Sequence, residues 1–118
     1  MIQRELYMKR IRPFIGNELI KVLTGLRRSG KSVMLELIQQ ELLAMGVNKE
    51  QFIYYNFEQM KNAHLCNAQA LYTEIMAQVQ KIEGKKYLFF DEIQEVQNWE
   101  KCINSFRLDF DCDIYLTG

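Results

Sequence analysis

Short apolar runs alternate along this chain with longer segments in which apolar residues recur every three or four positions. The runs have the length of strands, and because they hold few polar positions they predict strands covered on both faces. They are IKVLT (20–24), FIYYNF (52–57), YLFF (87–90) and DIYLTG (113–118). The periodic segments predict amphipathic helices. They cover residues 31–45, 65–82 and 99–110.

The ends of these segments carry residues that commonly begin or end helices. Gly46 and Gly84 follow the first two predicted helices and are expected to end them, and Asn98 is a candidate N-cap for the third. Residues 1–12 hold several basic side chains and predict a further helix, which Pro13 would end. The alternation of strands and helices predicts an α/β fold with a parallel sheet and helices on both of its faces. Ligands of such folds bind at the carboxyl ends of the strands.

Composition adds a few constraints. A chain of 118 residues suits one domain, and its 15 basic and 15 acidic residues balance, so bulk charge does not indicate nucleic acid as a partner. Cys66, Cys102 and Cys112 form no CxxC pair and are expected to be reduced, mostly buried thiols. No segment has the roughly 18 apolar residues of a membrane span, and the start of the chain does not resemble a signal peptide. These features favour a cytoplasmic protein without a membrane partner.

The stretch GLRRSGKS (25–32) fits the phosphate-binding pattern G-x-x-x-x-G-K-[ST]. It follows a predicted strand and opens a predicted helix, which is the context that such a loop, the Walker A motif or P-loop, requires. Backbone N–H groups would surround the phosphates, while Lys31 would reach the β- and γ-phosphates and Ser32 would bind Mg²⁺. The predicted nucleotide-binding residues are Gly25, Leu26, Arg27, Arg28, Ser29, Gly30, Lys31, Ser32 and Val33.

An acidic pair ends the third predicted strand in YLFFDE, as in a Walker B strand. Asp91 is expected to hold Mg²⁺ through water, and Glu92 is expected to polarise the water that attacks the γ-phosphate. Asn56 stands near the end of the second predicted strand. If that strand neighbours the third, the Asn56 side chain could hydrogen-bond Glu92, which makes it a further candidate for the catalytic set.

Each of these motifs also has a plainer interpretation. GLRRSGKS could be a strand–turn–helix whose serine caps the helix, and the two acids could be a solvated strand end. Asn56 could simply begin a turn, with Glu58 capping the same loop. Arg27 and Arg28 either contact phosphate or a neighbouring subunit, or they are solvated or structural, because the backbone of the loop already serves the phosphates.

Taken together, GLRRSGKS, the NFE after the second strand, FFDEIQEVQNWE and the final DIYLTG resemble the amino-terminal part of a prokaryotic AAA+-type ATPase family. The resemblance covers nearly the whole chain. It implies a three-layer αβα P-loop NTPase core in which the fourth strand lies between the P-loop strand and the Walker B strand or its neighbour. It also implies a polar sensor at the end of the fourth strand, where Thr117 stands. The predicted catalytic set is therefore Lys31, Asn56, Glu92 and Thr117, with ATP or ADP and Mg²⁺ as cofactors.

Larger members of that family continue into a carboxyl-terminal domain of unknown function. A whole module also has a fifth strand, a helical lid and an arginine finger, so this chain is expected to be a core truncated after the fourth strand. Residues 1–19 would be a basic lead-in, and residues 20–118 the nucleotide-binding part of a single domain. The arginine finger would come from another subunit of a homo-oligomer or from the carboxyl-terminal domain.

The expected function is ATP binding, with Mg²⁺-dependent hydrolysis in the full-length protein and slow or no turnover by this chain alone. Two alternatives stay open: a nucleotide-dependent binding or scaffold module with vestigial hydrolysis, and a P-loop kinase. The adjacent acids favour hydrolysis, since a water-activating acid beside the Mg²⁺ acid suits it. A GTPase is disfavoured because the chain holds no N/T-K-x-D motif.

Overall fold

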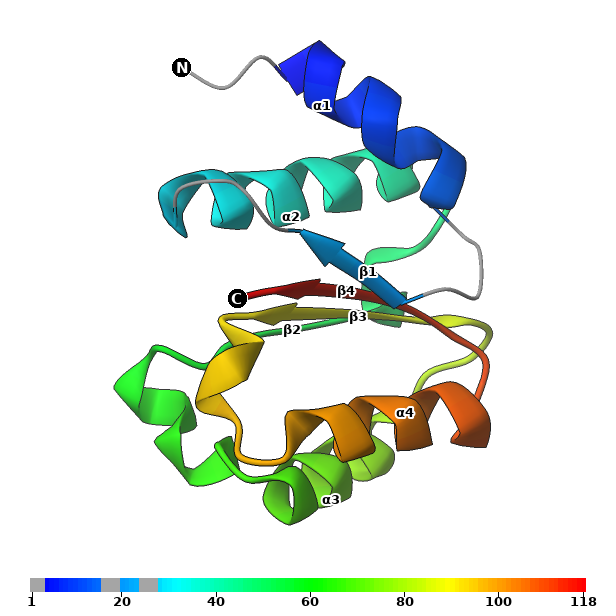
Figure 1. Cartoon of the computed structure of the whole chain (residues 1–118). Coiled ribbons are helices and arrows are strands. Elements are labelled where there is room, and N and C mark those ends of the chain that lie inside the picture. The colour runs from blue at the N-terminus through cyan, green and yellow to red at the C-terminus, as the bar shows by residue number, and fades with distance from the viewer. Residues whose placement is uncertain (1–3, 16–19, 24–27) are drawn as a thin grey trace.

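The computed structural model describes residues 4–15, 20–23 and 28–118. Figure 1 shows three layers, with a sheet between two pairs of helices. One pair is α1 (Arg4–Ile11) and α2 (Arg28–Ala44), and the other is α3 (Ala68–Val79) and α4 (Trp99–Asp109). The strands are β1 (Ile20–Leu23), β2 (Phe52–Asn56), β3 (Lys86–Asp91) and β4 (Cys112–Thr117). The predicted three-layer α/β fold class is confirmed.

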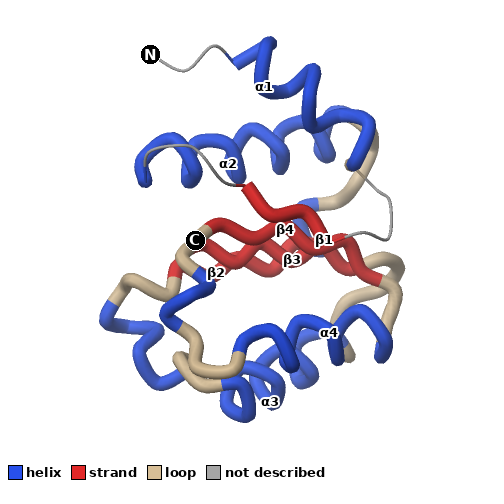
Figure 2. The backbone as a smooth tube through the Cα atoms, in the orientation of Figure 1, coloured by secondary structure: helices blue, strands red, loops and turns tan. Residues whose placement is uncertain are grey.

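The sheet has the strand order β1-β4-β3-β2, and neighbouring strands run parallel. β4 therefore lies between β1 and β3, as the resemblance implied, and β2 is the neighbour of β3. The register pairs Asn56 with Asp91 and Leu23 with Thr117. The carboxyl ends of the strands thus meet at one edge of the sheet, which is also where the chain ends (Figure 2).

An apolar core fills the space on each side of the sheet. Successive residues of a strand point to opposite faces, so Phe89 and Phe90 of β3 enter different cores. Phe89 stacks on Tyr115 of β4, with ring centroids 5.2 Å apart, beneath α2. Phe90 meets Phe106 of α4 at 6.2 Å on the other side. This burial on both faces explains the uninterrupted apolar run YLFF (87–90) of β3.

The helices differ from their predicted bounds in ways that have local causes. α2 begins at Arg28, three residues before the predicted start, so Gly30 lies within its first turn. Of the predicted helix 65–82, only Ala68–Val79 forms α3, and Leu65 is the last residue of a preceding 3₁₀ segment, Met60–Leu65. The two are separate because Asn67 caps α3: its extended backbone places Oδ1 2.9 Å from the Ala70 N–H.

The predictions about helix ends gave mixed outcomes. Gly46 ends α2 as predicted: it has a φ of 101°, and its N–H donates to the Leu43 carbonyl oxygen. The prediction that Gly84 ends α3 is wrong, because that helix ends at Val79 with Gln80 as its C-cap. The prediction that Asn98 caps α4 is wrong. Asn98 precedes α4 with a left-handed φ of 61°, and its side chain makes no capping hydrogen bond. An N-cap side chain reaches the helix N–H groups from an extended backbone, which Asn98 does not have.

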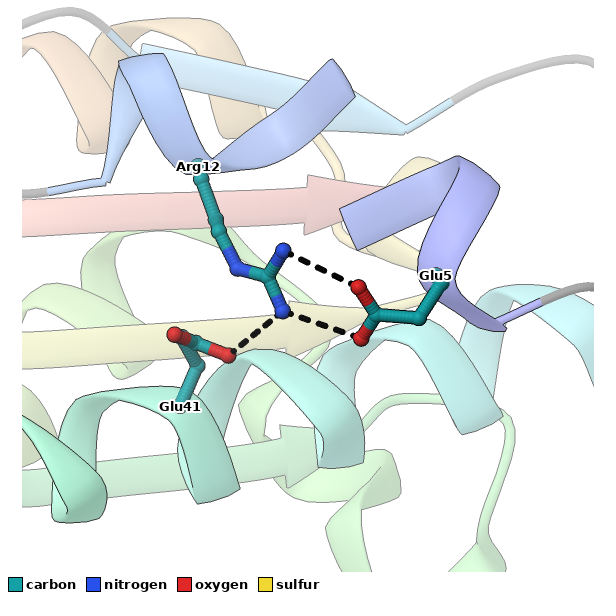
Figure 3. A network of polar contacts seen from close by, with 3 residues as sticks. All are labelled: Glu5, Arg12 and Glu41. Carbon is teal, nitrogen blue, oxygen red and sulfur yellow. Dashed lines mark hydrogen bonds and ion pairs between the residues drawn. The ribbon is translucent and has the colours of Figure 1, made fainter. Parts of the chain in front are cut away.

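Arg12 connects the basic amino-terminal helix to α2, as Figure 3 shows. Its guanidinium donates hydrogen bonds to Glu5 Oε1 at 3.1 Å and to Glu41 Oε1 of α2 at 3.2 Å. The bond to Arg12 lowers the pKa of Glu5. The pairs are largely exposed, and solvent screening keeps such contacts weak. These contacts link α1 to α2. They also give Arg12, one of the basic residues of the predicted lead-in, acidic partners within the domain.

Candidate functional site

Asp91, the last residue of β3, is fully buried and accepts hydrogen bonds from three hydroxyl groups. Ser32 Oγ of α2 donates to Oδ2 at 2.5 Å, and the Tyr54 hydroxyl of β2 donates to the same oxygen at 3.2 Å. Thr117 Oγ1 of β4 donates to Oδ1 at 2.5 Å. The four residues come from four elements that meet at the carboxyl edge of the sheet. Ser32, the last residue of the predicted phosphate loop, therefore touches the acid predicted to hold Mg²⁺.

The position of Ser32 follows from the amphipathic pattern of α2. Leu35 is three residues further along the same helical face and is 1% exposed, because that face packs on the sheet. Ser32 lies one turn before Leu35 and reaches past the apolar core to the end of β3. The helix therefore carries the serine to Asp91 as a consequence of burying its apolar side.

Glu92 follows Asp91 in a left-handed backbone conformation, with φ 58° and ψ 51°. Few residues other than glycine adopt this conformation, so the surrounding contacts must stabilise it. Its N–H donates to Thr117 Oγ1 at 3.0 Å, and its Oε1 accepts from Gln94 Nε2 at 2.7 Å. Thr117 therefore contacts both acids: it donates to the Asp91 carboxylate and accepts from the Glu92 backbone.

Asn56 lies beside Asp91 in the register but has a different role from the predicted one. Its Oδ1 accepts a hydrogen bond from the Glu58 N–H at 3.0 Å, and its carbonyl oxygen accepts from Asn62 Nδ2 at 2.9 Å. Within the described residues, the Asn56 side chain makes this turn contact in place of the hydrogen bond to Glu92. The alternative interpretation, a residue that begins a turn, is the one that the contacts support.

Two residues at this edge were missing from the predicted set. Gln94 contacts Glu92, and Tyr54 contacts Asp91. Burial raises the pKa of Tyr54 to about 12, and the charge of Asp91 and the hydrogen bond to it act in the same direction. Tyr54 shares its strand face with Asn56, two residues before the end of β2. This two-residue spacing could have identified Tyr54 from the sequence, but only if β2 had been known to pair with β3.

The phosphate loop itself is described only in part. Gly25, Leu26 and Arg27 lie outside the described residues, and so do the side chains of Arg28 and Ser29. Residues 28–31 form the first turn of α2, whose N–H groups have no acceptor within the helix. Lys31, at the end of this turn, and Val33 in the next turn are both partly buried. The start of α2 therefore offers backbone donors beside Ser32 and Asp91.

The oxygen atoms gathered at this edge suit Mg²⁺ better than a softer metal. Among the residues described, no group of three or more His, Cys, Asp or Glu side chains is placed to hold a metal ion. Mg²⁺ in nucleotide sites needs no such group, because one or two protein ligands act together with phosphate oxygens and water. Ser32 and Asp91 are a matching protein contribution, since their oxygens already lie in contact.

A second buried polar cluster lies toward the opposite end of the strands. Lys21 of β1 is paired with Asp113 of β4, and the Tyr115 hydroxyl donates to the other Asp113 oxygen at 2.5 Å. The Lys21 ammonium also lies 4.8 Å from the centre of the Tyr115 ring. Burial lowers the pKa of Lys21, and the contact with Asp113 opposes that shift. This cluster joins β1 to β4 and is separate from the edge that carries Asp91.

The fold and this edge together define the class of protein. A parallel sheet with the order β1-β4-β3-β2, whose first strand leads into a helix that brings a serine to a strand-end aspartate, is consistent with a P-loop NTPase-like core. Comparison with known families agrees. Residues 17–118 match a family described as an AAA domain, and the chain belongs to it. The domain is thus of the ATPase-like, nucleotide-binding kind.

The chain is also similar to longer prokaryotic proteins. It is 37% identical over 118 residues to an uncharacterised protein of Haemophilus influenzae, and this match covers the whole chain and 30% of that protein. It is 35% identical over 100 residues to an uncharacterised protein of Methanocaldococcus jannaschii, which covers 84% of the chain and 21% of that protein. The chain thus spans less than a third of either relative. No solved structure matches the chain significantly, and no helix among the residues described could cross a membrane.

Proposed function

We propose that this domain binds ATP with Mg²⁺ and hydrolyses it to ADP and phosphate. The observation that carries the proposal is the convergence of Ser32 and Thr117 on the buried carboxylate of Asp91. Burial of the apolar face of α2 brings Ser32 to the strand-end acid, but packing alone does not require a hydroxyl group there. It has a clear chemical reason if both oxygens serve one Mg²⁺.

Each group at the edge has a role in this chemistry. The N–H groups at the start of α2 bind phosphate oxygens, and the Lys31 ammonium neutralises the charge on the β- and γ-phosphates. Ser32 and Asp91 hold the Mg²⁺, which when bound neutralises charge that develops on the phosphates. Glu92 accepts a hydrogen bond from the attacking water and orients it. Thr117 fixes both acids relative to each other.

Hydrolysis also needs positive charge near the γ-phosphate in the transition state. In other NTPases an arginine finger supplies it and accelerates the reaction by about 10³–10⁵. We propose that this arginine comes from a second subunit or from a part of the longer protein. The isolated domain is therefore expected to bind nucleotide well and to hydrolyse ATP slowly.

Titration calorimetry with ATP and Mg²⁺ tests the binding step. Lys31→Ala removes a charged partner of the phosphates, and each lost contact of this kind costs about 1.5–3 kcal/mol, or roughly ten- to hundredfold in affinity. Lys101→Ala is a matched control, since Lys101 is exposed on α4 on the other side of the sheet. Equal ATP affinity of the two variants would refute the phosphate-binding role of the loop.

The hydrolysis step is tested separately with Glu92→Gln. This variant should keep ATP bound and lose the phosphate release that the parent chain shows in a single-turnover assay. If Glu92→Gln releases phosphate at the parent rate, Glu92 does not act on the water. If the full-length protein binds ATP without any phosphate release, the alternative of a nucleotide-dependent binding module replaces the hydrolase.

A further inference from the structure

Gln94 holds the side chain of Glu92 from one side. Its Nε2 donates to Glu92 Oε1 at 2.7 Å, and the two residues are separated by a single position at the start of the 3₁₀ segment Ile93–Glu95. Glu92 is 5% exposed, whereas Gln94 is exposed. The exposed Gln94 therefore contacts a carboxylate that is itself buried. An amide that donates to one carboxylate oxygen limits rotation of the carboxylate and leaves the second oxygen to other partners.

The Gln94 side chain lies beside the end of β4. A Cβ atom placed on Gly118 would lie 2.2 Å from Gln94 Oε1 and 3.3 Å from its Cδ, so the glycine leaves room for the amide in its present position. Gly118 follows Thr117 directly, and Thr117 accepts the Glu92 N–H. The end of β4 thus binds the backbone of Glu92 through Thr117, and Gln94 binds its side chain.

We infer that Gln94 is a positioning residue that orients the Glu92 carboxylate toward the attacking water, and that Gly118 provides the space for it. The inference rests on the proposed hydrolysis of ATP. Glu92 has a left-handed backbone at the end of β3, the residue is 5% exposed, and its Oε1 accepts a hydrogen bond from the Gln94 amide. A water-orienting acid must be held in one geometry, since small displacements lower the rate strongly. The Gln94 amide supplies this constraint.

The consequence is a specific pattern of effects on binding and turnover. Gln94 contacts Glu92 and not the predicted phosphate-binding residues Lys31 and Ser32, so its loss should leave the affinity for ADP with Mg²⁺ within about twofold of the parent. Binding of a mimic that includes the attacking water should weaken about tenfold, which is about 1.4 kcal/mol. The rate of phosphate release should fall by a similar factor while the KM for ATP stays unchanged.

The experiment compares Gln94→Met with Gln97→Met. Methionine is similar in length to glutamine but has no N–H donor, and Gln97 is an exposed residue three positions further along that serves as the control. Fluorescence titration measures the affinity of each variant for ADP–Mg²⁺ and for ADP–Mg²⁺–aluminium fluoride, a mimic of the transition state. Thermal unfolding of each variant measures any loss of fold. This readout needs no turnover by the isolated domain.

The expected result is a tenfold weaker affinity of Gln94→Met for the aluminium fluoride complex, with unchanged ADP affinity and a parent-like unfolding temperature. Gly118→Ala would place a Cβ against Gln94 and would also strain the backbone, since Gly118 has a φ of 151°, so Gln94→Met is the variant that isolates the amide contact.

Parent-like binding of the aluminium fluoride complex by Gln94→Met would overturn the inference and leave the proposed function intact. Equal losses for ADP and for the mimic, together with a lower unfolding temperature, would also overturn it, since they indicate a purely structural role. A parent chain that binds neither ligand would instead refute the proposed function, and the inference with it.

Discussion

Replacing Thr117 by valine would test the contact that joins the two acids. The Thr117 hydroxyl is completely buried, donates to Asp91 Oδ1 at 2.5 Å and accepts from the Glu92 N–H at 3.0 Å. Valine has nearly the same shape as threonine, so Thr117→Val leaves no large cavity and changes mainly these two hydrogen bonds. The variant therefore measures what the hydroxyl contributes to the fold of the edge.

The magnitude follows from the two partners. Losing a hydrogen bond to a charged group costs about 1.5–3 kcal/mol, and a buried N–H without an acceptor costs about 1–3 kcal/mol. The Glu92 N–H lies at a strand end where a small backbone shift can admit water, so we expect a total near the lower end, about 3 kcal/mol. For a domain of this size, that free energy corresponds to a fall of roughly 12 °C in the unfolding temperature.

Urea denaturation and thermal unfolding followed by circular dichroism measure this loss without any nucleotide. Thr73→Val is the matched control: Thr73 is exposed on α3, and its Oγ1 only accepts a 3.4 Å contact from Gln69. The control should change stability by less than about 0.5 kcal/mol. If Thr117→Val were as stable as Thr73→Val, the hydroxyl would not stabilise the arrangement of Asp91 and Glu92.

Lys21→Met leaves the Asp113 carboxylate buried without its partner and should lower the free energy of unfolding by about 3–5 kcal/mol, whereas Lys21→Met combined with Asp113→Asn should recover much of it. Urea denaturation measures the free energy of unfolding of both variants. Equal losses of stability in the single and the double variant would contradict the proposed cost of the unpaired charge. Burial raises the pKa of Cys102 to about 12 and that of Cys112 to about 11, so the unfolded chain releases protons above pH 9 that the folded protein keeps. The free energy of unfolding should thus fall between pH 9 and 11, by about 1.4 kcal/mol per pH unit for each thiol, and a flat profile across that range would refute it. Tyr54→Phe removes a long hydrogen bond to the predicted metal-binding acid and should raise the Mg²⁺ concentration needed for half-maximal ADP binding about two- to fivefold, with Mg²⁺-free binding unchanged. An unaltered Mg²⁺ requirement would mean that the Tyr54 hydroxyl has no part in the metal site.

The pattern of the sequence was sufficient for the layers and for the order of the elements along the chain. Each predicted strand is present, because an apolar run such as YLFF has to be buried on both faces and only a sheet between helices allows it. Asp91 at the end of YLFFDE and Ser32 at the end of GLRRSGKS lie at the carboxyl edge, in contact with each other. This placement depends only on strand direction, since parallel strands end on the same side.

The role of a side chain could not be predicted where two interpretations of the sequence differed only in its hydrogen-bond partner. The Asn56 side chain could form a turn with the backbone of nearby residues or a hydrogen bond to Glu92. The sequence offers partners for both contacts. The turn was formed because the Glu58 N–H is two residues away and needs no long-range alignment. Asn98 failed as a cap for a similar reason: the residue type fits, but its left-handed backbone turns the side chain away from the helix N–H groups.

The amino-acid sequence by itself thus determined the α/β class, the phosphate-loop pattern and the acidic strand end, because these depend on periodicity and on residue types at short spacing. Only the tertiary structure decided which groups meet: Ser32, Tyr54 and Thr117 are far apart in the chain and converge on Asp91 through the insertion of β4 between β1 and β3. The strand order is set by how the whole chain buries its two apolar cores. No local pattern encodes it, so the partners of Asp91 and Glu92 become visible only once the sheet is assembled.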